Sequence, residues 1–171
     1  MALTHNLIQT RRLVSNQTTI TFSNIPQTYT DLRLLVSARS TATGQVRRYV
    51  NVNINSSSSP QTYVRSIAYS TNNTVTDFDN VNSNYLVMTT DGADSGVFGI
   101  GELYFINYSG STNKAVTCTS GALSSGNSEH MIGIWGATRS TTTAITSLQF
   151  TCEIGDFVAG SVFSLYGIKK L

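Results

Sequence analysis

The sequence predicts an all-β protein: a jelly-roll-like β-sandwich of about ten antiparallel strands in one domain, residues 1–171. Three observations support this prediction. Apolar and polar residues alternate with a period of two in segment after segment, as in half-buried strands. Ser, Thr and Asn make up roughly a third of the chain, and these residues favour strands and turns. No segment combines an apolar stripe of helical period with capping residues.

The alternation is clearest in the N-terminal half of the chain. In residues 31–39, apolar side chains at every second position share one face, while Arg33 lies on the other. Residues 18–22 and 46–54 show the same pattern. The predicted strands are residues 18–22, 31–39, 46–54, 62–69, 84–89, 97–107, 115–120, 130–136, 144–154 and 161–169.

The segments between these strands carry turn residues such as Asp91-Gly92 and Ser109-Gly110. Residues 70–84 form the longest polar stretch, which predicts an exposed loop. Residues 1–13 precede the regular pattern and can form an extended N-terminal arm. We find no internal repeat and no domain boundary.

The composition excludes several classes of protein. No stretch of about 18 apolar residues is present, so no membrane span is expected, and the first residues do not resemble a signal peptide. Cys118 and Cys152 lie at core-facing positions of predicted strands and are expected to be buried free thiols. A disulfide is the alternative if the two strands are neighbours.

The charges are unevenly distributed along the chain, although the net charge is only +2. Seven arginines precede residue 66 together with one acid, whereas most acidic residues follow. This asymmetry indicates either complementarity to an acidic surface or a neighbouring copy, or simply solvated strand faces. No nucleic-acid-binding motif accompanies the arginines, so nucleic acid is not an expected partner. The basic interface candidates are Arg11, Arg12, Arg47 and Arg48.

No group of residues predicts catalysis. His5 lies near the terminus and His130 opens a predicted strand, and no glycine pattern of a nucleophile elbow surrounds any serine. The three glutamates lie in separate segments, and phosphate-binding and dinucleotide-binding patterns are absent. We therefore expect a protein that is not an enzyme and that uses no cofactor.

Calcium binding is the strongest chemical candidate, because carboxylate and amide oxygens are ligands that Ca²⁺ prefers. Asp77, Asp79 and Asn82 cluster in the polar segment 70–84. Their spacing departs from an EF-hand loop, since Val81 stands where a ligand would be. A solvated turn is the alternative.

Aromatic residues are the other candidate contacts. Tyr29 and Tyr108 border turns, so we expect both to be exposed and available to a protein or a sugar. Trp135 lies in an apolar run and is expected in the core or at an interface.

Three stretches of the sequence resemble small virion proteins of tailed bacteriophages, including phages of cyanobacteria and marine bacteria. They cover about a third of the chain, in the same order and at similar spacing. The terminal Ser-Leu-Tyr-Gly-Ile-Lys, residues 164–169, is the most specific element. The stretches are residues 20–32 (ITFSNIPQTYTDL), residues 108–114 (YSGSTNK), and the ending from residue 144 (AITSLQF) through residues 155–158 (GDFV) to residues 163–170 (FSLYGIKK).

The resemblance implies a β-sandwich that assembles on the phage particle. We expect a capsid decoration (cement) protein that bridges capsomers on the capsid exterior, after assembly in the host cytoplasm. Its implied partners are the major capsid protein and further copies of itself, as a homotrimer. The alternative is a module of a tail or head fibre that contacts carbohydrate on the host surface.

Overall fold

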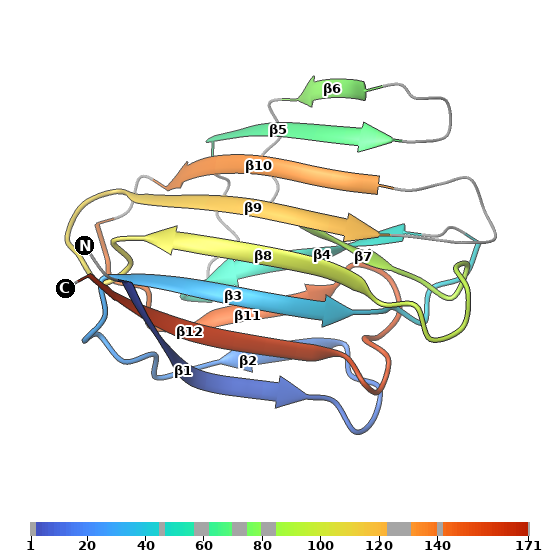
Figure 1. Cartoon of the computed structure of the whole chain (residues 1–171), viewed down its shortest axis with the longest axis horizontal. Helices are drawn as coiled ribbons and strands as arrows, with labels where there is room; N and C mark the ends of the chain where they lie inside the picture. Colours follow the sequence, from blue (N-terminus) through green and yellow to red (C-terminus); the bar gives the residue numbers. More distant parts are fainter. Residues whose placement is uncertain are drawn as a thin grey trace.

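The computed structural model describes residues 3–44, 47–56, 62–69, 75–79, 85–122, 131–139 and 142–170, with the backbone alone for residues 3, 62–69, 75–79, 85, 139 and 170. This part of the chain folds into twelve strands in two antiparallel sheets (Figure 1). It contains no helix, and therefore none long and apolar enough to cross a membrane. The strands are β1 (Leu3–Arg12), β2 (Thr19–Phe22), β3 (Asp31–Ala38), β4 (Arg47–Ile54), β5 (Thr62–Tyr69), β6 (Val75–Asp79), β7 (Tyr85–Thr89), β8 (Gly99–Ile106), β9 (Lys114–Ala122), β10 (Met131–Arg139), β11 (Leu148–Cys152) and β12 (Val162–Lys170).

The larger sheet has eight strands in the order β1-β12-β3-β8-β9-β10-β5-β6, and the smaller has four in the order β2-β11-β4-β7. The chain crosses between the sheets repeatedly: β1 and β3 belong to the large sheet, and β2 and β4 to the small one. Figure 1 looks onto the outer face of the large sheet, with the small sheet behind its lower half. Strands β5 and β6 extend beyond the small sheet.

The core lies between the two sheets and is built by every second residue of their strands. In β3 and β11 the buried and part-exposed residues alternate, as the sequence pattern predicts. Phe150 of the small sheet packs against Phe22 and against Phe163 of the large sheet, with ring centroids 6.1 and 5.8 Å away. Burial of each such side chain stabilises the fold by about 1.5–3 kcal/mol.

The all-β fold in two antiparallel sheets is confirmed, and each of the ten predicted segments overlaps a strand. Two further strands were not predicted. Residues 3–12, expected as an arm, form the edge strand β1 and pair along their length with β12. Ile8 packs against the core while Leu7 is 57% exposed, so an edge strand with a bulge here lacks the alternation that marks central strands.

The second unpredicted strand is β6, which lies within the segment expected to be an exposed loop. Its backbone pairs with β5, with Asp79 opposite Arg65. Its sequence, VTDFD, contains Val75 and Phe78 three residues apart and not at alternate positions, so it shows no strand pattern.

Candidate interaction surface

The outer face of the large sheet is formed by β12, β3, β8, β9 and β10, which lie side by side. Residues directly opposite each other on paired strands share a face, so the register defines rows across the sheet. One row reads Val162, Ser37, Ile100, Gly121 and Ile132, and the next reads Ser164, Leu35, Glu102, Thr119 and Ile134.

Five aliphatic side chains in these two rows form what we call the apolar face. Ile100, Ile132 and Ile134 are 65%, 52% and 56% exposed, although their strands lie in the middle of the sheet. Large exposed apolar side chains that gather in one area typically mark an interaction site. The residues of the apolar face are Leu35, Ile100, Ile132, Ile134 and Val162.

A shallow groove of about 490 Å³ crosses the apolar face. Gly121 lies between Ile100 and Ile132 in its row, so the missing side chain leaves a gap between two isoleucines. Leu35 and Thr119 also line the groove. A Cβ atom built on Gly121 would meet only the carbonyl oxygen of Met131, at an ordinary 3.5 Å, so internal packing does not require glycine here.

The charges beside the apolar face compensate each other. Arg33 donates two hydrogen bonds to Glu102, with Nε–Oε1 and Nη2–Oε2 distances of 3.0 and 2.8 Å. This hydrogen bonding raises the pKa of Arg33 further. Tyr104 donates a hydrogen bond to buried Asp31, and its burial together with this bond raises the pKa of Tyr104 to about 12. The Arg33–Glu102 pair thus carries one charge of each sign, and Tyr104 is uncharged at neutral pH.

The outer face of the small sheet is different in character. Along β2, β11 and the second half of β4, its outward residues are uncharged amides and hydroxyls, and some bond to one another, as Asn53 does to Gln149 at 3.2 Å. Thr19 and Thr151 pair in the same way at 3.5 Å. We call this surface the polar face; its residues are Thr19, Thr21, Asn51, Asn53, Gln149 and Thr151.

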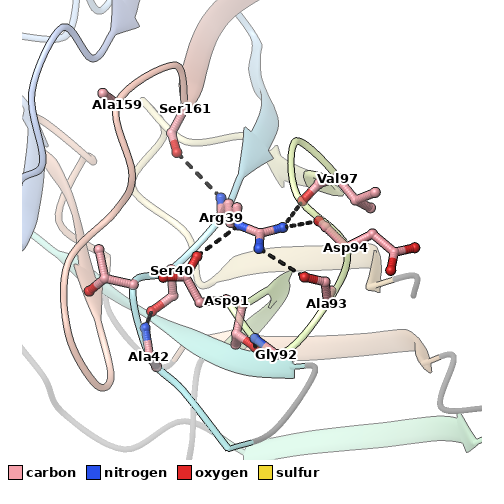
Figure 2. Close-up of polar contacts among 12 residues, drawn as sticks. Arg39, Ser40, Ala42, Asp91, Gly92, Ala93, Asp94, Val97, Ala159 and Ser161 are labelled. Atoms are coloured by element: carbon pink, nitrogen blue, oxygen red, sulfur yellow. Dashed lines mark hydrogen bonds and ion pairs between the residues drawn. The ribbon is translucent and has the colours of Figure 1, made fainter. Parts of the chain in front are cut away.

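One end of the sandwich is held together by Arg39, whose side chain is buried (Figure 2). Its guanidinium donates hydrogen bonds to the backbone carbonyls of Ala93, Asp94 and Val97, at 2.6–3.0 Å, and to the carboxylate of Asp91 at 3.1 Å. A buried guanidinium with this many acceptors fixes the loop that joins β7 to β8. Because the guanidinium bonds to the Asp91 carboxylate and to three carbonyls of this loop, we assign Arg39 a structural role.

Two predicted interface residues, Arg11 and Arg12, lie at this same end of the sandwich. They are exposed and line a polar groove of about 370 Å³ between β1 and β2, together with Gln17 and Thr19. The other predicted pair, Arg47 and Arg48, begins β4 in the small sheet and is partly buried. Arg11 and Arg12 thus belong to an edge strand of the large sheet, and Arg47 and Arg48 to a strand of the small sheet that pairs with neither β1 nor β2.

The expectation that Tyr108 is exposed is wrong: its side chain is completely buried at the opposite end of the sandwich. Its hydroxyl donates a hydrogen bond to the carbonyl of Pro26, and burial raises its pKa. Tyr29 is only partly exposed and packs against the core, with its ring over Gly167. Both tyrosines were expected to be exposed because they border turns. Here these turns fold back onto the sandwich.

The three stretches that resemble phage virion proteins meet at this end. Ile25 donates a backbone hydrogen bond to Thr146, and Ile145 donates one to Tyr108. Lys114, buried among them, donates to the carbonyls of Gly110 and Thr112, and burial lowers its pKa. Parts of these stretches therefore build this end, which we call the closed end of the sandwich, whereas residues 155–158 lie at the other end, where Val158 donates a backbone hydrogen bond to Arg39.

The remaining candidates are the three predicted calcium ligands and the two cysteines. The backbone of Asp77 and Asp79 lies in strand β6 and not in a loop, and Asn82 lies outside the described residues. Among the side chains that the structure describes, no group of three His, Cys, Asp or Glu residues converges on a metal position. Cys118 and Cys152 are buried free thiols, as expected, and burial raises the pKa of both.

Sequence reasoning missed the apolar face, although a signal was present. In the run from Met131 to Trp135, Met131 and Trp135 point into the core while Ile132 and Ile134 point outward. Apolar residues on both faces of a strand indicate burial on both sides. Because the small sheet covers only the inner side, the outer isoleucines are left exposed.

No protein-family model matches this chain, and no curated protein sequence matches it either.

Proposed function

We propose that this chain is a structural protein of a tailed-phage virion, a capsid decoration protein that stabilises the head by bridging capsomers. The observation that carries the proposal is the apolar face: a rigid sheet presents three isoleucines to solvent without any need of its own fold. On soluble proteins, exposed apolar patches of this kind mark interaction sites. The proposed location is the capsid exterior, next to the major capsid protein.

The topology supports this proposal by analogy of fold. We infer that eight strands form a jelly-roll core, in which four strands of the large sheet (β1-β12-β3-β8) face the small sheet (β2-β11-β4-β7). The hairpins β5–β6 and β9–β10 are then insertions that widen the large sheet. Jelly rolls are common in viral shells and in lectins, so this inference favours assembly or sugar binding over catalysis.

The exposed residues favour capsid assembly over carbohydrate binding. Two aromatic residues were expected to be available to a sugar, Tyr29 and Tyr108. Tyr108 is buried in the core at the closed end of the sandwich, and Tyr29 packs against this core. The apolar face, by contrast, offers aliphatic side chains, which suit a protein partner better than carbohydrate hydroxyls. A fibre module that binds carbohydrate is therefore the weaker alternative.

The test is quantitative mass spectrometry and cryo-electron microscopy of purified particles of the phage that encodes the chain. We expect copies in a fixed, high ratio to the major capsid protein, with density for the sandwich on the exterior of the head. A particle that lacks the chain, or carries it only in a tail fibre, would contradict the proposal.

A further inference from the structure

We infer that the apolar face is a self-complementary interface, which binds the apolar face of a second copy of this chain about a two-fold axis, as a dimer and not as the homotrimer that the resemblance implies. The inference deepens the proposed function, since it rests on that face being buried on assembly and names the occupant. Four features of the described residues support it: unexplained glycines, shape, charge and area.

The glycines indicate that another polypeptide approaches closely. Inside the sandwich, strand glycines have packing reasons: a Cβ on Gly101 would lie 2.6 Å from Leu86, and one on Gly167 would lie 2.3 Å from Tyr29. On the outer face, Gly121 and Gly136 have none, because a Cβ there would meet only carbonyl oxygens at 3.5 and 4.0 Å. Glycine weakens a strand, and where the fold does not need it, it often marks the close approach of another backbone.

The shape of the face is complementary to itself. Ile100 and Ile132 stand on either side of the groove at Gly121, and Ile134 stands in the adjacent row. In a two-fold interface each contact occurs twice, so a ridge beside a hollow on one copy meets the hollow and the ridge of the other. An isoleucine of each copy can thus fill the groove of its partner.

The charge of the face also fits a second copy. Arg33 and Glu102 lie next to each other, with Nη2 and Oε2 2.8 Å apart, and each is about one-third exposed. A strongly acidic or basic partner would find no matching net charge here. A second copy, turned by the two-fold axis, offers the opposite member of each pair and leaves both charges compensated.

The available area is sufficient for a specific dimer. Five strands about 4.8 Å apart, each with about eight residues of about 3.3 Å, have an outer face of roughly 600 Å² per copy, and the two rows of the apolar face cover about half of it. When the whole outer face of both copies is buried, the total of about 1,200 Å² reaches the lower bound of specific interfaces. Because this area is at the lower bound, we expect a reversible dimer with a measurable dissociation constant.

The experiment is sedimentation velocity of the purified chain over a wide range of protein concentration. We expect the wild type to change from monomer to dimer, and Ile134→Asp to weaken association at least about tenfold, as for a central interface residue. Val14→Asp is the matched control: Val14 is 92% exposed and lies outside the sheets, so this variant should associate like the wild type. Gly121→Val, which fills the groove without adding charge, should also weaken association.

Circular dichroism and thermal unfolding of each variant separate misfolding from loss of the interface. A wild type that stays monomeric at all concentrations would overturn the inference, and so would an oligomer of any size that Ile134→Asp and Gly121→Val leave intact. A monomer that is nonetheless present on the capsid would leave the proposed function standing. A face-to-face dimer that is absent from particles would leave the dimer standing and refute the virion role.

Discussion

The two outer faces of the sandwich enclose one core but differ in the residues they present. On the polar face, outward side chains such as Thr21 and Asn53 are amides and hydroxyls that bond to water and to each other. On the apolar face, the corresponding positions hold Ile100, Ile132 and Ile134. Outward residues add little to the core, so their identity reflects what lies outside. In our proposal, solvent lies against the polar face and a protein partner against the apolar face.

The largest expected effect separates inward from outward residues of the same strand. Trp135 is 6% exposed and its neighbour Ile134 is 56% exposed. Trp135→Ala should therefore lower the free energy of unfolding by about 3–5 kcal/mol through the cavity it leaves. Ile134→Ala should change it by less than about 1 kcal/mol.

Urea unfolding followed by tryptophan fluorescence measures Ile134→Ala, and circular dichroism measures Trp135→Ala. An equal loss of stability in both variants would mean that Ile134 serves the fold, and the comparison between faces would fail.

A smaller effect is expected from two glycines that differ in what surrounds them. A Cβ on Gly167 would lie 2.3 Å from the ring of Tyr29, so Gly167→Ala should destabilise the fold by about 1–3 kcal/mol. A Cβ on Gly121 would meet only the carbonyl oxygen of Met131, at an ordinary 3.5 Å, so Gly121→Ala should be neutral or stabilising by up to about 1 kcal/mol. Thermal unfolding of the two variants beside the wild type checks both signs. Destabilisation by Gly121→Ala would show that the fold itself requires this glycine.

The smallest effect is on the pH dependence of stability. It arises from Tyr104, which lies beside the apolar face, whereas the polar face has no titratable group. The pKa of Tyr104 is about 12 in the folded chain, against about 10 for an unfolded tyrosine. The unfolded state therefore loses its proton first, and stability falls as the pH rises from about 10 to about 12. We expect a loss of about 1 kcal/mol after allowing for solvent screening at a partly exposed side chain.

Tyr104→Phe should remove this part of the alkaline loss, as measured by urea unfolding at several pH values. None of the six residues of the polar face titrates, so Thr21→Ala should keep the full alkaline loss. An unchanged pH dependence in Tyr104→Phe would assign the effect to other tyrosines.

Much of the fold followed from the sequence, because a central strand buries one side chain in two. Residues 31–39 and 144–154 alternate clearly, and both contain strands of the core. The edge strands β1 and β6 escaped prediction because an edge is held mainly by backbone pairing, to which side chains contribute little.

The interaction surface followed less well from the sequence, because alternation says which residues share a face but not which face is covered. Ile132 and Ile134 could have been core residues under another layer. Likewise, Tyr108 stands at a turn, and only its contact with Pro26 from a distant segment explains its burial. Arg39 resembled any other arginine of a basic N-terminal half until its carbonyl partners were located.

The central claim is that a protein partner covers the apolar face. Carbene footprinting with mass spectrometry tests it most directly, with the chain in dilute solution, in concentrated solution and on purified phage particles. We predict that labelling of Ile100, Ile132 and Ile134 falls on assembly, while labelling of Val14 stays constant. Equal labelling of the three isoleucines under all three conditions would show that the face remains in water, and would contradict the account.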